Sequence, residues 1–520
     1  MKPSPSISCH CSQDGSTAAA MIIRALQRSF STAQVCEKPL APDAPTGAIA
    51  VYIRPGPEAL GPMQHVAARG GKVLVFGAPA PDILPLLGLE AVAAVSLEGL
   101  DAAEMCFTEH HHASPGLVRY TEHPLALASP LRQRFFRRYD YAEWNNLGYG
   151  AITTDGSAFA ADGGIAPREA VELAGILRQE RRQPPRYLGP YITLHDRSRG
   201  SLLWCARPVG PLDSVEWQVV ERFICDWRPD LCCLPCLLQT PKGCACLVTM
   251  RLDCDEDIRS ARPLFDWYLS RGVPFSLAVK TGLDMGPEDV ALLEAVRESG
   301  GTLLSHSRTH PLCWGADVAQ ALEEARSSRE WFGQQWPDQP LPRLAVSPFH
   351  TNPPYAVQAL AQAGYAGFVG GIIHSDPECN LGRAGLVPFA EGIVSISQQS
   401  MLHGDSFRNQ GEGVAVHVEA CNAQKMARGI FGYLDHPFSQ RYQYGWDSEQ
   451  QRIQAHALLL DAVGCEESVW FWNQQQCFDF VSALAESALR LEDDTVSGQS
   501  SREDVEYRLR GKTTLLRPGS

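Results

Sequence analysis

The sequence contains no long apolar run and no excess of basic residues. Its 520 residues are 44% hydrophobic and 20% charged, which is typical of a globular protein. No uninterrupted apolar stretch approaches the roughly 20 residues needed to span a bilayer, so we expect no integral membrane segment. Asp and Glu outnumber Lys and Arg by 59 to 45, which gives a net charge of −14. That balance argues against nucleic acid as a partner, because binding its backbone requires clustered basic side chains.

A secretory signal and a cysteine framework are also missing. The N-terminal segment has no apolar core of the secretory kind, and the 17 cysteines are scattered along the chain. Reduced thiols are then the default, so the sequence predicts a cytoplasmic protein. The densest cysteine group has a poor ligand spacing and favours core cysteines over a structural zinc site; it comprises Cys232, Cys233, Cys236, Cys244 and Cys246.

The length of the chain predicts two or three domains. Residues 1–45 are small, polar and Pro-containing, which predicts a disordered leader. Between residues 46 and 240, strand-like runs beginning at Gly47 and Gly71 bracket a helical segment, which predicts a smaller α/β domain of the flavodoxin-like kind. Residues 493–520 are polar, and we expect a flexible tail there.

Residues 244–492 show a regular alternation of apolar, β-branched runs with amphipathic helical segments. This alternation predicts parallel strands covered by helices. The number of such units in a short stretch favours a barrel over an open sheet. In barrels of this kind the chemistry lies at the carboxyl ends of the strands.

Candidate catalytic side chains follow three of these predicted strands. Asp253 and Asp255 end the first strand, His306 and His310 follow the third, and His436 follows a later one. Two imidazoles four residues apart and one carboxylate form a divalent-metal site with open positions for water and substrate. Such an ion polarises an amide carbonyl and activates water. A second carboxylate can then accept the proton of the water, and a histidine on the opposite side can protonate the leaving amine.

These residues resemble the motifs of a known family. His-Ser-Arg-Thr-His from His306 to His310, Asp-Cys-Asp ending at Asp255, and Leu-Asp-His ending at His436 are similar to the motifs of the NodB-type polysaccharide deacetylases, carbohydrate esterase family four. The resemblance implies a distorted (β/α)7 barrel. It also implies that Asp253 is the catalytic base, that Asp255, His306 and His310 bind the metal, and that His436 is the general acid.

The resemblance further implies an activity and its partners. We expect a hydrolase that removes N-acetyl groups from an amino-sugar-containing carbohydrate, with zinc as the first choice of divalent ion. Hydrolysis of another non-peptide C–N bond on the same fold is a close alternative. A non-catalytic carbohydrate-binding or scaffold protein of a polysaccharide-assembly system is the second alternative. The sequence predicts neither the sugar nor the oligomeric state.

Two positions in the barrel depart from the family pattern or leave a choice open. The third motif usually has an Arg before a Pro, but the segment ending at Pro348 has none, so Arg251 or Arg343 is the candidate substitute. His417 lies on a strand-like segment and is the alternative to His436 as the acid. His403 is interpreted as an ordinary loop histidine, with a place in the pocket as the alternative.

The N-terminal half resembles the end of glutamine-amidotransferase-like domains at the segment from Gly210 to Trp217. It contains no Gly-x-Cys-x-Gly nucleophile motif, so we expect an accessory or substrate-positioning role there, with no amidotransferase activity.

Overall fold

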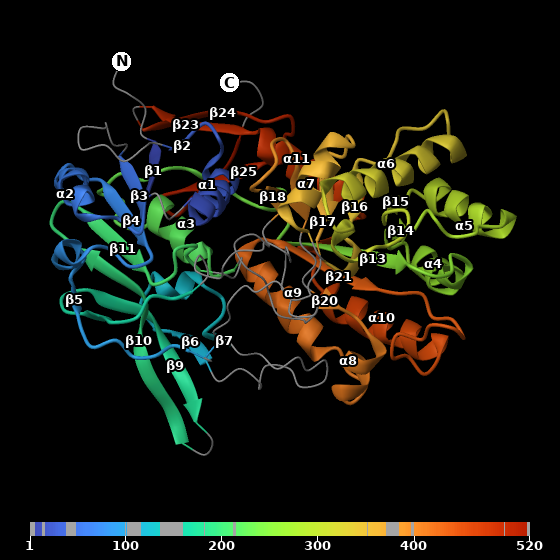
Figure 1. Cartoon of the computed structure of the whole chain (residues 1–520), viewed down its shortest axis with the longest axis horizontal. Helices are drawn as coiled ribbons and strands as arrows, with labels where there is room; N and C mark the ends of the chain where they lie inside the picture. Colours follow the sequence, from blue (N-terminus) through green and yellow to red (C-terminus); the bar gives the residue numbers. More distant parts are fainter. Residues whose placement is uncertain are drawn as a thin grey trace.

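The fold is described from a computed structural model of the chain. The structure describes residues 6–12, 16–37, 48–98, 100, 116–135, 160–180, 183–211, 215–350, 352–370, 384–396, 400–492 and 494–516. Figure 1 shows two halves side by side, the N-terminal half from blue to green and the C-terminal half from green to orange.

The N-terminal half is built on one nine-stranded sheet. Its strands are β1 (Ile7–Cys11), β2 (Val35–Glu37), β3 (Ile49–Ile53), β4 (Lys72–Phe76), β6 (Gly116–Tyr120), β7 (Gln133–Phe135), β9 (Val171–Glu180), β10 (Gln183–Asp196) and β11 (Ser201–Cys205). The strands β2-β1-β3-β4-β11 are parallel and follow the order of flavodoxin-like sheets. The strands β10, β9, β6 and β7 continue the sheet in antiparallel fashion, which the sequence did not predict.

Among the described residues, this half also contains three α-helices and a pair of short antiparallel strands. They are α1 (Ser16–Phe30), α2 (Leu60–Ala68), α3 (Gln218–Cys225) and the pair β5 (Leu89–Ala91) with β8 (Ile165–Pro167).

The prediction of a disordered leader at residues 1–45 is wrong for the part that the structure describes. The strand β1 lies between β2 and β3, and α1 buries Ile22, Leu26 and Phe30 completely. These three apolar residues recur every fourth position, so they form one apolar stripe on the helix. The small and polar residues around them dominate the average composition, which is why composition alone indicated disorder.

The C-terminal half contains a ring of parallel strands. The strands are β13 (Cys246–Cys254), β14 (Ser276–Val279), β15 (Thr302–Ser305), β16 (Leu344–Val346), β17 (Gly367–Val369), β19 (Val394–Ile396), β20 (Ser400–Met401) and β21 (Ile430–Asp435). Pairing runs from β13 through β14, β15, β16 and β17 to β19, and from β20 through β21 back to β13. The strand β19 therefore borders β17, and β20 borders β21, so the described pairing runs from β19 at one end to β20 at the other.

Among the described residues, the parallel strands occupy seven positions when β19 and β20 are taken as one, in agreement with the predicted distorted (β/α)7 barrel. Its helices are α4 (Arg262–Ser270), α5 (Pro287–Glu298), α6 (Val318–Gln335), α7 (Pro354–Gln362), α8 (Gly404–Asn409), α9 (Ala415–Ala427), α10 (Glu449–Val463) and α11 (Gln474–Glu486). Two short strands add to the ring: β18 (Gly385–Leu386) is antiparallel to β19, and β22 (Val469–Phe471) is parallel to β13.

The prediction of a flexible tail is also wrong for the residues described. The hairpin of β23 (Ala488–Glu492) and β24 (Thr495–Gln499) precedes β25 (Glu506–Leu509) and β26 (Lys512–Leu515), which form a three-stranded sheet with β12 (Cys236–Leu237). Val505 and Leu516 are buried, and Arg508 Nε lies 2.5 Å from Asp226 Oδ2. A few apolar anchors and backbone pairing to a distant segment order this polar stretch (red in Figure 1).

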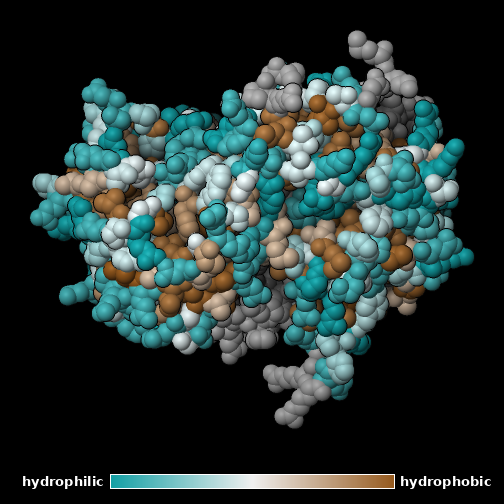
Figure 2. Space-filling view, turned by 180° about the vertical axis from the view of Figure 1, so that it is seen from behind, coloured by the Kyte–Doolittle hydropathy of each residue, from teal (hydrophilic) through white to brown (hydrophobic). Residues whose placement is uncertain are grey.

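One of the apolar clusters extends across both halves. A single cluster contains Ile22 of α1 together with Leu360 of α7 and Phe368 of β17. The helix α1 also contacts β18 and α11. On the face seen in Figure 2, hydrophilic residues separate the apolar ones into patches. Within the described residues, none of the helices combines the length and the apolar character that crossing a membrane requires.

Candidate active site

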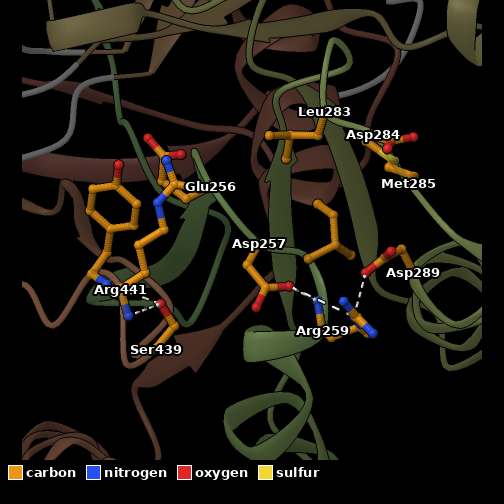
Figure 3. A pocket seen from close by; sticks show the side chains of 11 residues that line it. Glu256, Asp257, Arg259, Leu283, Asp284, Met285, Asp289, Ser439 and Arg441 are labelled. Carbon is orange, nitrogen blue, oxygen red and sulfur yellow. Dashed lines mark hydrogen bonds and ion pairs between the residues drawn. The ribbon is translucent and has the colours of Figure 1, made fainter.

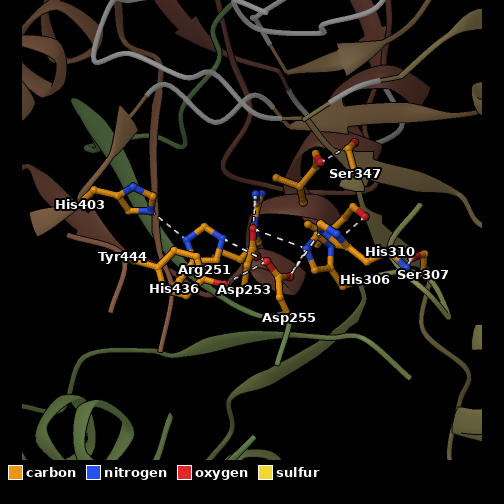
Figure 4. A network of polar contacts seen from close by, with 12 residues as sticks. Arg251, Asp253, Asp255, His306, Ser307, His310, Ser347, His403, His436 and Tyr444 are labelled. Carbon is orange, nitrogen blue, oxygen red and sulfur yellow. Dashed lines mark hydrogen bonds and ion pairs between the residues drawn. The ribbon is translucent and has the colours of Figure 1, made fainter. Parts of the chain in front are cut away.

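The predicted metal ligands converge at the carboxyl ends of β13 and β15 (Figure 4). Asp255 directly follows β13, His306 directly follows β15, and His310 lies in the loop after it. Asp255 Oδ1 lies 3.1 Å from His306 Nε2 and 3.5 Å from His310 Nε2. One ligand atom from each of the three residues lies within 4.8 Å of the others. The sequence pattern and the tertiary structure therefore bring together the same three side chains.

The hydrogen bond of His306 leaves its other ring nitrogen available as a ligand. His306 Nδ1 lies 3.1 Å from the carbonyl oxygen of Val346 at the end of β16, so this nitrogen carries the hydrogen and donates it. In that tautomer Nε2 holds a lone pair directed at Asp255 Oδ1. This carboxylate oxygen is buried and has no hydrogen-bond donor among the described residues. Lone pairs facing each other at 3.1 Å are repulsive unless a metal ion or a proton lies between them, so the donor set fits a divalent ion.

A proton competes with the metal for this position. Burial lowers the pKa of His306, but Asp253 and Asp255 outweigh burial and the net pKa is raised. For His310, burial and the neighbouring His306 lower the pKa to about 4, which keeps its ring in the neutral form that binds metals. Metal binding at this cluster is therefore expected to release a proton from His306.

The loop that carries the histidines is held by α6. Glu324 accepts hydrogen bonds from the backbone nitrogens of Arg308 at 2.9 Å and Thr309 at 2.8 Å. Ser307 and His310 both have positive φ angles, of 59° and 60°. Non-glycine residues rarely adopt this conformation, and it occurs at sites where the surrounding structure enforces it. The carboxylate of Glu324 supplies part of that enforcement by bonding the turn between the two histidines.

The candidate base, Asp253, is held by an arginine of its own strand. Arg251 Nε lies 2.6 Å from Asp253 Oδ1, and Arg251 Nη2 lies 3.0 Å from Oδ2. Both side chains are buried, and they point into the ring because residues two apart on a strand share a face. Burial raises the pKa of Asp253, but Arg251 and His306 outweigh burial and the net pKa is lowered. Asp253 is therefore ionised and oriented, as a base must be.

This pair decides between the two arginines that the sequence left open. Arg343 is half exposed and pairs with Asp479 at 3.6 Å, at a surface position outside the polar network of Figure 4. Arg251 thus takes the place of the arginine that is missing before Pro348.

The candidate acid, His436, lies opposite the two ligand histidines. It directly follows β21, and its Nε2 lies 3.5 Å from Asp255 Oδ2. Its ring stacks on Tyr444, with centroids 4.2 Å apart and an interplanar angle of 11°. Its Nδ1 lies 2.9 Å from Nε2 of His403. This contact supports the alternative that His403 belongs to the pocket, and no sequence motif indicated it because His403 lies outside the three motifs.

The alternative acid, His417, lies elsewhere and is fully engaged. The segment predicted as a strand is the helix α9, on which His417 is buried. Its Nδ1 lies 2.5 Å from Ser400 Oγ and its Nε2 lies 3.3 Å from Ser406 Oγ. A ring with both nitrogens bonded to structural hydroxyls is not available as a general acid.

A buried network supports the segment that carries His436. Asp435 accepts hydrogen bonds from His456 Nε2 at 3.0 Å, Trp446 Nε1 at 3.1 Å and Arg452 Nη1 at 3.4 Å. Arg452 Nη1 also donates to the carbonyl oxygen of His436 at 3.0 Å. Burial raises the pKa of Asp435, but His456 and Arg452 outweigh burial and the net pKa is about 2. The backbone of His436 is therefore fixed by charge-assisted hydrogen bonds.

A pocket of about 240 Å³ lies beside these residues (Figure 3). One side is formed by Glu256, which follows Asp255 in the chain, and by the segment from Ser439 to Tyr442, which follows His436. The other side belongs to the loops at the ends of β13 and β14, where Arg259 Nε lies 3.3 Å from Asp289 Oδ1. The lining contains the four carboxylates of Glu256, Asp257, Asp284 and Asp289 and the two guanidinium groups of Arg259 and Arg441.

Comparisons with known proteins yield structural likenesses only. No family model and no curated protein matches the chain. Among solved structures, a polysaccharide deacetylase from Mycobacterium smegmatis is 13% identical, covers 47% of this chain and 94% of its own, and has a TM-score of 0.34. A chitin deacetylase from Colletotrichum lindemuthianum (13% identical, 46% and 89%, TM-score 0.32) and a family 4 acetyl xylan esterase from Clostridium thermocellum (13%, 45% and 90%, TM-score 0.30) are similar to a comparable extent. At these TM-scores the likenesses carry no argument about function, so any inference has to rest on the geometry of the site.

Proposed function

We propose that this protein is a metal-dependent hydrolase that removes N-acetyl groups from an amino-sugar-containing carbohydrate. One observation carries the proposal: in the metal-binding tautomer, the lone pair of His306 Nε2 faces Asp255 Oδ1 at 3.1 Å, and the part of the chain that the structure describes offers this oxygen no other hydrogen-bond donor. The ordered carboxylate of Asp253 lies on one side of this cluster, 3.9 Å from His306 Nε2, and His436 lies on another, 3.5 Å from Asp255 Oδ2. A cation site between a base and an acid is the arrangement that amide hydrolysis requires.

In the proposed reaction, Asp255, His306 and His310 would hold a divalent ion, which supplies Lewis-acid activation when bound. Asp253 accepts a proton from the attacking water, and Arg251 keeps that carboxylate ionised and in place. His436 donates a proton from Nε2 to the departing nitrogen as the C–N bond breaks. The products are acetate and a free amine. Asp253 then loses the proton that it accepted, and His436 regains a proton, by exchange through solvent. Both side chains are thereby back in their starting protonation states.

The arginine contact of Asp253 weakens the case for a non-catalytic binding protein. The main support for that alternative was the missing arginine of the third motif, and Arg251 fills the position with two hydrogen bonds. A module that only binds carbohydrate has no need of a buried, charge-paired carboxylate beside a cation site, because burying a charge costs several kcal/mol unless it is paired.

The pocket beside the site supports a polyhydroxylated substrate without phosphate groups. Four carboxylates offer acceptors for sugar hydroxyl groups, and they outnumber the two guanidinium groups. An excess of negative charge repels phosphate, so neutral oligosaccharides are expected to be better substrates than nucleotide-linked sugars.

The proposal includes the metal and the compartment. Zinc suits a site of two imidazoles and one carboxylate. All 15 cysteines of the described residues are free thiols, which supports a reducing, cytoplasmic location.

The test is acetate release from N-acetylglucosamine oligomers and from nucleotide-linked N-acetyl sugars. Zinc-loaded wild type is compared with Asp253→Asn, His306→Ala and the matched control His417→Gln, which changes a buried histidine outside the site. We expect release by wild type and by His417→Gln, and loss in the other two variants.

Other results separate the alternatives. Absence of release, with one metal ion per chain that His306→Ala loses, would reject deacetylation and direct the search to other C–N bonds. Absence of both release and bound metal would favour the binding protein.

A further inference from the structure

His403 contacts the candidate acid from outside the motifs. It lies between β20 and α8, and its Nε2 is 2.9 Å from His436 Nδ1, with the two ring centroids 5.1 Å apart. Tyr444 lies against both rings, at centroid distances of 4.2 Å from His436 and 5.7 Å from His403. His436 is thus held at its face by an aromatic ring and at one edge by a hydrogen bond (Figure 4).

The backbone around His403 fixes its position relative to His436. Leu402 N donates to the carbonyl oxygen of Leu434 at 2.8 Å, and Gly404 N donates to that of Tyr444 at 3.2 Å. A Cβ at Gly404 would lie 2.1 Å from the backbone of Gly445, so only glycine allows this close approach of the two segments. The chain therefore brings His403, His436 and Tyr444 into one rigid group.

The ring of His403 has one lone pair and one N–H group to offer. Burial and the neighbouring His436 lower the pKa of His403 to about 3, so its ring is neutral at any working pH. When His436 is protonated, both of its nitrogens carry hydrogen, and the 2.9 Å contact requires His403 Nε2 to be the acceptor. The hydrogen on His436 Nδ1 is then engaged in the hydrogen bond to His403, and the proton on Nε2 remains available for transfer.

We propose that His403 is a positioning residue whose Nε2 accepts the Nδ1 hydrogen of His436 and thereby restricts proton donation to His436 Nε2, the nitrogen that faces Asp255. This inference rests on the proposed function in so far as His436 is the acid. His403 acts through His436 and does not itself contact the reacting atoms. After donation, His436 is left as the neutral Nδ1–H tautomer with Nε2 bare, ready to be protonated again at the same nitrogen.

Two variants separate this role from simple packing. His403→Phe keeps a ring against Tyr444 and loses the acceptor, whereas His403→Gln keeps an acceptor oxygen and loses the ring. We expect His403→Phe to lower kcat about tenfold to a hundredfold at nearly unchanged KM and metal content. His403→Gln is expected to recover most of kcat. Wild-type kcat in His403→Phe, or equal losses in both variants, would overturn the proposal.

A second readout does not depend on catalysis. Nitrogen-15 NMR of histidine-labelled, zinc-loaded protein reports the tautomer of His436, whose signals are identified by their absence in His436→Gln. We expect neutral His436 to be the Nδ1–H tautomer in wild type and to shift toward the Nε2–H tautomer in His403→Phe. An Nε2–H tautomer in wild type overturns the proposal. If no substrate releases acetate while the expected tautomers are seen, the proposed function fails and the positioning role stands.

Discussion

Both halves of the molecule carry charged groups at the carboxyl ends of parallel strands, but their hydrogen bonding differs. In the N-terminal half, Arg54 follows β3 and pairs at 3.5 Å with Asp162, which also accepts a hydrogen bond from Ala78 N at 2.7 Å. In the barrel, Asp255 Oδ1 is buried with no hydrogen-bond donor among the residues described, and two histidine nitrogens face it. Charge at a strand end is therefore not sufficient to indicate a site; converging lone pairs without donors are the informative feature.

The largest effect is expected for a variant of a metal-ligand residue, compared with a variant of a carboxylate in the N-terminal half. His306→Ala should lose the bound metal and lower kcat on the order of a thousandfold, because the ion and its oriented water are lost together. Asp162→Asn should change neither quantity, because that carboxylate is engaged with Arg54 and a backbone nitrogen. Metal content and acetate release of the two variants provide the measurement. Equal metal binding in both variants would contradict the assignment of the ligands.

The next effect concerns the two arginines considered for Asp253. Arg251→Met leaves a fully buried carboxylate without its partner, so the free energy of unfolding should fall by about 3–5 kcal/mol. We expect kcat to fall about a hundredfold through the loss of orientation of the base. Arg343→Met is the control, since Arg343 pairs with Asp479 at the surface. Chemical denaturation and initial rates measure both effects, and similar results for the two variants would show that Arg251 has no special role.

A smaller effect is the dependence of stability on acid pH. The folded pKa of Asp435 is about 2, below the value of about 4 in an unfolded chain. Because the folded pKa is the lower one, this carboxylate stabilises the fold fully above pH 4 and loses that contribution as the pH falls to 2. Two pKa units correspond to roughly 3 kcal/mol.

The measurement is the free energy of unfolding in urea between pH 5 and pH 2 for wild type and Asp435→Asn. The difference between the two proteins should shrink by about this amount as the pH falls. The pKa shift of Asp162 has the opposite sign, because burial raises its pKa above the ordinary value. Removing its charge should therefore not weaken the protein at neutral pH in the same way. A pH-independent difference for Asp435→Asn would contradict the assigned shift.

The smallest expected effect is that of Arg54→Gln. The pair with Asp162 is partly exposed, at 29% and 21% of the two side chains, so solvent screens it. We expect a change below about 1 kcal/mol in the free energy of unfolding and no change in kcat. A loss of activity would assign the N-terminal half a direct part in catalysis, and the contrast between the two strand edges would then fail.

The local sequence pattern predicted the barrel well but the segments near the two ends of the sequence poorly. The alternation of apolar strands with amphipathic helices between residues 244 and 492 depends on side chains close in sequence, and it indicated the parallel ring correctly. The prediction failed for the described residues 6–12, 16–37 and 494–516, because Ile22 and Val505 are buried against residues far away in the chain. Average polarity carries no information about such partners.

The sequence by itself determined which side chains form the candidate metal cluster. His306 and His310 are four residues apart, and Asp255 ends a strand, so the parallel ring necessarily places them at one end. Only the tertiary structure shows that Arg251 and not Arg343 contacts Asp253, that His436 lies beside Asp255 while His417 bonds two serines, and that His403 contacts His436. These choices depend on which face of a strand or helix a side chain occupies and on contacts across 33 residues, such as that between His403 and His436. The physical reason is that a hydrogen bond depends on the distance and direction between two groups in space. The spacing of residues along the sequence specifies these quantities only within one helical turn or one strand.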